Sequence, residues 1–98
     1  MTWQAQGDRI ELVTTGTAVA SASWRGGLGC LSITGLSGTP DFEMSPDNGT
    51  TWLDVKELGT GTAIAAVAAA GMWIFLLPMC LIRMSAGGGA MNVLATGI

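Results

Sequence analysis

The sequence predicts an all-β protein, an antiparallel β-sandwich of jelly-roll-like character with roughly eight short strands. Strand-length runs of apolar or alternating residues recur about every ten residues, a rhythm typical of antiparallel sandwiches and barrels. The chain has 15 glycines, many of them between these runs, where turns often need a positive φ. Its 98 residues are enough for one domain.

The first half of the chain supplies alternating strands. In chain order these are Arg9–Thr14, Thr17–Trp24, Leu28–Thr34, Asp41–Ser45 and Thr51–Val55. Alternation places every second side chain on the same face, as a half-buried strand requires. The Thr17–Trp24 run has small residues almost throughout, so another backbone can approach it closely.

The second half supplies more continuous apolar runs. In chain order these are Thr62–Val67, Met72–Leu77, Met79–Ser85 and Ala90–Ala95. Gly71 and Pro78 separate the middle runs at the spacing of turns. For the alanine-rich stretch Ala63–Ala70 a short helix or an irregular loop is an alternative to a strand, because alanine is the best helix former. We expect residues 1–7 to form an N-terminal arm and residues 8–98 a single sandwich domain.

The composition predicts an interface. Hydrophobic residues make up 49% of the chain and charged residues only 11%, against about 25% charged in an average protein. A domain this small cannot bury so much apolar surface, and contiguous exposed apolar patches mark contact sites. We therefore expect a homo-oligomer, or a protein docked on a partner.

Several function classes lack the residues they need. The chain has no histidine. Its four cationic residues are scattered along the sequence and its net charge is −3, so it lacks the basic patch that nucleic-acid binding requires. We expect no enzyme activity, no cofactor and no metal site. Asp41 and Glu43 share one face of a strand, and we interpret them as solvated acids opposite the inward-facing Phe42 and Met44.

The two cysteines are predicted to remain reduced. Cys30 shares a face with Ser32 and Thr34, whereas Cys80 shares the inward face with Ile82 and Met84. Opposite orientations disfavour one disulfide and favour two thiols that pack as small hydrophobes.

A membrane span over residues 62–82 is an alternative, because the chain carries no charge from Thr60 to Ile82. Gly71 and Pro78 interrupt it, and no positive cluster flanks it. Residues 1–8 are polar and lack the apolar region of a signal peptide, so we expect synthesis in a cytoplasm and no membrane association.

One motif stands out, from Ser45 to Trp52. Ser45, Asp47, Gly49, Thr51 and Trp52 match the Asp-box pattern S-x-D-x-G-x-T-W. The pattern predicts a hairpin in which Asp47 accepts bonds from backbone amides across a tight turn and Asn48-Gly49 supplies two positive φ angles. Trp52 is expected to lie over the turn. This role is structural and not catalytic.

The hairpin, the Gly71–Pro78 strand and the passage from Ile82-Arg83 into Gly87–Gly89 are similar to the small β-sandwich virion proteins of tailed bacteriophages, including capsid decoration (cement) proteins. The resemblance covers the C-terminal 60% or so of the chain by pattern. It implies a structural protein on the capsid surface of a virion that bridges subunits of the major capsid protein as a symmetric oligomer, with a trimer favoured.

Trp3, Trp24 and Arg25 are the candidate interface residues, because Trp and Arg are enriched among the residues that dominate binding energy. Trp73 is interpreted as a core residue. An exposed tryptophan can also stack on a sugar ring, so a carbohydrate-binding module on a phage fibre or spike remains a second alternative.

Overall fold

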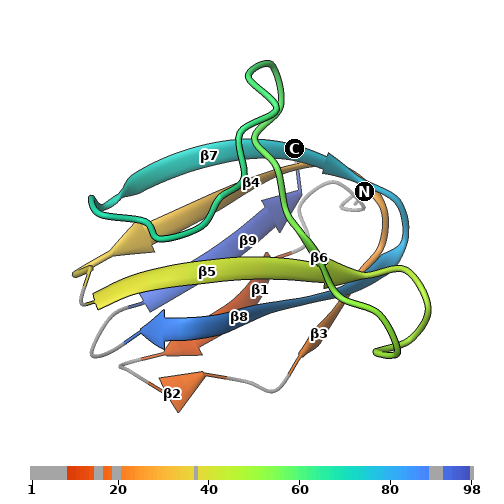
Figure 1. Ribbon diagram of the computed structural model, residues 1–98, viewed down its shortest axis with the longest axis horizontal. Coiled ribbons are helices and arrows are strands. Elements are labelled where there is room, and N and C mark those ends of the chain that lie inside the picture. The colour runs from red at the N-terminus through yellow and green to blue at the C-terminus, as the bar shows by residue number, and fades with distance from the viewer. Residues whose placement is uncertain (1–8, 15–16, 19–20, 37, 89–91, 98) are drawn as a thin grey trace, which may run out of the picture.

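The computed structural model describes residues 9–14, 17–18, 21–36, 38–88 and 92–97. Within them it contains strands and no helix (Figure 1). The strands are β1 (Arg9–Thr14), β2 (Thr17–Ala18), β3 (Ala22–Trp24), β4 (Gly27–Thr34), β5 (Gly38–Ser45), β6 (Leu53–Asp54), β7 (Gly71–Leu77), β8 (Cys80–Gly88) and β9 (Asn92–Gly97). The all-β prediction is confirmed.

The strands form two antiparallel sheets. The first has the order β2-β1-β9-β4-β7 and the second the order β3-β8-β5-β6. Apart from the two-residue β2, each sheet has four strands, and the chain changes sheets at every connection between described strands except β1 to β2 and β5 to β6. This arrangement is a jelly roll, in which two packed sheets enclose one core.

The core lies between the sheets. Alternation on every long strand sends one set of side chains inward, and the most buried of these include Leu12, Phe42, Phe75 and Val93. Trp24 of the second sheet reaches across to the first, where its ring centroid lies 5.0 Å from that of Phe75 with the rings tilted by 59°. Gly29 is the register partner of Phe75, so the indole packs over a position that has no side chain.

A long irregular segment closes one side of the sandwich, between β6 and β7. In Figure 1 it projects as a loop beyond β7 and returns between β7 and β5. Its backbone bonds both sheets, because Leu58 N–H donates to Ile74 O and Phe42 N–H donates to Ile64 O. Exposed strand edges are sites of unwanted pairing, and this segment occupies part of two of them.

The strand expected at Thr62–Val67 is wrong. These residues run beside β5 and bond it through Ile64 O and Val67 N–H, but Ala66 adopts a φ of 49°, which interrupts an extended strand. The one bridge assigned within Thr62–Val67 pairs Ala63 with Lys56, in the chain after β6, and not with β5.

The single strand expected at Thr17–Trp24 is also wrong. Its ends belong to different sheets, with β2 paired to β1 and β3 paired to β8. Sandwich corners are made where the chain switches sheets, and the chain switches sheets between β2 and β3. The strand expected at Thr51–Val55 shortens to Leu53–Asp54, because the preceding residues form the Asp-box turn.

The remaining strands follow the prediction with shifted ends. β1 coincides with it, β8 extends to Gly88, and β9 ends at Gly97 instead of Ala95. Residues 62–82, the alternative membrane span, hold the later part of the irregular segment, β7 and the start of β8. No helix long and apolar enough to cross a membrane occurs in the described ranges. The predicted arm, residues 1–7, lies outside them.

The Gly29→Ala variant should destabilise the fold. A Cβ at Gly29 would lie 2.6 Å from two ring atoms of Trp24 and 2.7 Å from one of Phe75, so the contact between the sheets must open. We expect a loss of about 1–3 kcal/mol in the free energy of unfolding, the usual cost of overpacking, measured by urea denaturation. Ser32→Ala, on the outer face of the same strand, is the control, and an equal loss in both variants would contradict the packing argument.

Candidate interaction surface

The outer face of the first sheet is apolar where β7, β4 and β9 lie side by side. Inward positions such as Leu31, Ile33 and Phe75 are buried, so their sequence neighbours point outward. Met72 and Leu76 are 70% and 59% exposed, and Leu28 and Ile74 are also exposed. The outer face, as defined here, consists of Leu28, Cys30 and Ser32 on β4, Met72, Ile74 and Leu76 on β7, and Leu94 and Thr96 on β9.

Strand register makes this face continuous. Leu28 lies opposite Leu76, and Cys30 lies opposite Ile74. On the other side of β4, Leu94 lies opposite Ser32. Directly opposed side chains in a sheet are close enough to touch. The exposed leucine, isoleucine and methionine side chains therefore form one patch and are not scattered.

The same three strands carry no charged residue. Charge on this sheet begins at β1, where Arg9 and Glu11 are exposed. An uncharged apolar face loses little hydration when covered, and identical copies of it meet without like-charge repulsion. The outer face is thus suited to contact with another protein surface.

The opposite sheet presents charges instead. Glu43 of β5 is the register partner of both Arg83 of β8 and Asp54 of β6. Arg83 donates to one oxygen of Glu43 from Nε at 3.1 Å and from Nη2 at 2.8 Å. Its guanidinium carbon also lies 3.8 Å from the centroid of the Trp52 ring.

Asp41, expected to be solvated, accepts a hydrogen bond from Ala66 N–H. Asp41 and Glu43 both face outward, but each has a partner.

The Asp-box residues meet in the turn between β5 and β6. The Ser45 hydroxyl is buried, donates to Asp47 Oδ1 at 2.8 Å and accepts from Gly49 N–H at 2.7 Å. Asp47 Oδ1 also accepts from Thr51 N–H at 2.8 Å. Asn48 and Gly49 have φ angles of 63° and 96°, which a tight turn of this kind requires.

Hydrogen bonding in this turn acts on the Asp47 carboxyl. The hydrogen bonds from Thr51 have the largest effect and the one from Ser45 a smaller effect; together they hold the pKa of the Asp47 carboxyl below its ordinary value of 3.8. Both donors favour the charged carboxylate, since each points a hydrogen at it. Asp47 is exposed, and its bonds go to the turn itself, so its role is to hold the hairpin closed.

The predicted interface residues do not come together as expected. Trp24 is only 3% exposed, so its assignment as an exposed contact residue is wrong; its large apolar ring fills the space between the sheets. Arg25 follows it at the surface. Trp3 lies outside the described residues. Trp73 is half-buried and packs against the core.

The cysteines point in opposite directions. Cys80 is buried, Cys30 is half-buried, and both are free thiols. Burial raises the pKa of the Cys80 thiol, which keeps it protonated and unreactive.

Sequence reasoning missed Met72, Ile74 and Leu76 as surface residues. The run Met72–Leu77 is apolar at every position, so alternation gives no sign of which face is buried. The sequence does show that three of the strands, β4, β7 and β9, carry no charge. It does not show that these strands are neighbours, because their order is set by the topology.

Comparison of the chain with protein-family models, with curated proteins and with solved structures gave no significant match.

Acid should remove the stabilising effect of Asp47. Because the folded-state pKa lies below 3.8, the ionised carboxylate stabilises the fold at neutral pH, and this effect is lost as the pH falls through the folded-state pKa. We expect Asp47→Asn to lower the melting temperature at neutral pH and to converge with the wild type in strong acid, measured by circular dichroism. A difference that stays constant with pH would contradict this account.

The Trp52–Arg83 contact should show measurable coupling. A double-mutant cycle with Trp52→Leu and Arg83→Met isolates this pair from the Arg83–Glu43 ion pair. We expect a coupling free energy of about 0.5–1 kcal/mol, the usual value for a cation over an indole near the surface. Additive effects of the two substitutions in urea denaturation would show that the stacking contributes nothing.

Proposed function

We propose that this protein is a structural subunit that associates with copies of itself through the outer face of β7, β4 and β9. The single observation that carries the proposal is the contiguous apolar patch on three strands without charge. Apolar burial stabilises an interface by about 25 cal/mol per Å² before the costs of association. Symmetry repeats that contact in every subunit pair.

The proposed place of this assembly is the capsid surface of a tailed bacteriophage, where the oligomer would bridge subunits of the major capsid protein. Support comes from the resemblance of the Asp-box hairpin and the strands after it to small virion proteins. The jelly roll is in keeping with this role, since viral capsid domains use it. A fold alone does not assign a function, so the apolar face carries more weight than the topology.

The carbohydrate-binding alternative has less support. Sugar recognition uses an exposed aromatic face, and among the described residues Trp24 is buried, Trp73 packs against the core and one face of Trp52 is covered by Arg83. The two sheets instead differ in polarity, which separates an apolar contact face from a solvated one. That asymmetry is expected of a subunit in an assembly.

Leu76→Lys should dissociate the oligomer. A lysine at this position of the outer face would be buried without a partner in the assembly, and loss of a dominant contact typically costs about 2 kcal/mol or more, roughly 30-fold in affinity. Mass by light scattering after size exclusion, at micromolar protein, is the measurement. The wild type should be oligomeric and Leu76→Lys monomeric.

The matched control is Leu53→Lys. The exposed fraction of Leu53, 52%, is similar to the 59% of Leu76. Leu53, however, lies on β6 in the charged sheet, beside Asp54. This variant should keep the wild-type mass. A monomeric wild type, or equal loss of mass in both variants, would refute association through the outer face. The capsid role is tested separately by cryo-EM of particles incubated with each variant, where only Leu76→Lys should lose occupancy.

A further inference from the structure

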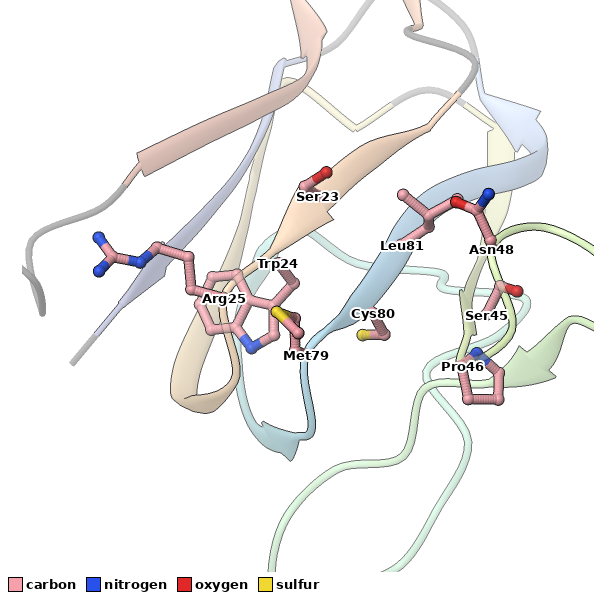
Figure 2. Close-up of a pocket in the computed structure, with 9 residues that line it drawn as sticks. All are labelled: Ser23, Trp24, Arg25, Ser45, Pro46, Asn48, Met79, Cys80 and Leu81. Atoms are coloured by element: carbon pink, nitrogen blue, oxygen red, sulfur yellow. The ribbon is translucent and has the colours of Figure 1, made fainter.

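A hollow of about 310 Å³ lies at the end of the second sheet, bordered by the β3–β4, β5–β6 and β7–β8 turns (Figure 2). This volume is at the lower end of the range for small-ligand sites, about 300–1,000 Å³. The β3–β4 and β7–β8 turns pack closely through their backbones, since a Cβ at Gly26 would lie 3.1 Å from Met79 N. The hollow lies on different elements from the outer face.

One wall of the hollow contains an orphan hydrogen-bond donor. Trp24 Nε1 is buried and has no hydrogen-bond partner, and it is the only such side-chain atom in the described part of the chain. Figure 2 shows the five-membered ring, with Nε1, on the side of Met79 and Cys80. Buried donors without partners are rare in folded proteins, so this N–H indicates a group that the fold itself does not supply.

Met79 and Trp24 line the hollow together. The Met79 side chain is 77% exposed. Methionine is unbranched and rotates easily, so it is the lining group best able to move aside. Trp24 is fixed, because its ring packs against Phe75 and over Gly29. A rigid donor and a movable side chain in one hollow are suited to a ligand that inserts.

The lining favours a peptide over a sugar. Five of its nine residues are apolar, and of the four polar ones the Ser45 hydroxyl is already engaged with Asp47 and Gly49; the apolar residues are Trp24, Pro46, Met79, Cys80 and Leu81, and the polar ones are Ser23, Arg25, Ser45 and Asn48. A sugar needs several polar partners and an open aromatic face, whereas the face of Trp24 is buried. A peptide carbonyl needs one donor, and the apolar walls accept the side chain next to it.

We propose that this hollow binds an extended segment of a partner protein, whose backbone carbonyl accepts a hydrogen bond from Trp24 Nε1 and whose apolar side chain packs against Leu81 and Pro46. The inference does not depend on self-association through the outer face. It assigns the turn end of the sandwich as a second contact site, specific for peptide.

The test is an NMR titration of the ¹⁵N-labelled protein with N-acetyl-leucine methylamide, with methyl β-galactoside as the carbohydrate arm. The Trp24 indole N–H resonance should shift saturably with the amide and remain unchanged with the glycoside. In Trp24→Phe, followed at the Leu81 backbone amide, affinity for the amide should fall roughly 2- to 10-fold, as for a lost hydrogen bond. Trp73→Phe is the control and should bind as the wild type does.

Ser23→Tyr provides a test that leaves the core intact. Ser23 is exposed and lines the hollow, so a tyrosine there should fill it and abolish the shift, whereas Thr39→Tyr on exposed β5 surface should not. The proposal is overturned by an indole N–H that contacts only water and ignores the amide, by an unchanged response in Ser23→Tyr, or by saturable binding of the glycoside.

Discussion

The contact of Trp24 with Gly29 and Phe75 is the constraint on which the rest of the structure depends. It is where the second sheet, through β3, packs on two neighbouring strands of the first. The indole occupies the space that a side chain at position 29 would need, so the glycine sets the local distance between the sheets. Interiors are packed too densely for this contact to shift without cost.

Two consequences follow from that contact. Inward packing of Phe75 and Leu31 turns their neighbours on β7 and β4 to the outside, which produces the apolar outer face. Burial of the indole also leaves its N–H at the wall of a hollow with no acceptor. Both proposed contact sites are therefore products of how the core is filled.

The charged sheet shows why only one of the two sheet faces is proposed as a contact face. Arg83 of β8 pairs with Glu43 of β5 and stacks on the Trp52 ring, Asp54 of β6 adds an exposed charge, and the Asp-box turn satisfies its own backbone amides. Such groups are well hydrated and costly to cover. The outer face of β7, β4 and β9 has no comparable group among its strands, so burial there removes mostly apolar surface from water.

The sequence by itself determined the all-β class, most strand positions, the inward orientation of Phe42 and Cys80, and the hydrogen bonding expected of Ser45 and Asp47. These are local properties, since alternation and turn chemistry act over a few residues. Only the tertiary structure decided that β2 and β3 belong to different sheets, that Thr62–Val67 is an irregular cover, that Trp24 is core, and that Met72 and Leu76 are surface. Those outcomes depend on which strands become neighbours, and a run such as Met72–Leu77, apolar at every position, holds no local information about which side will be covered.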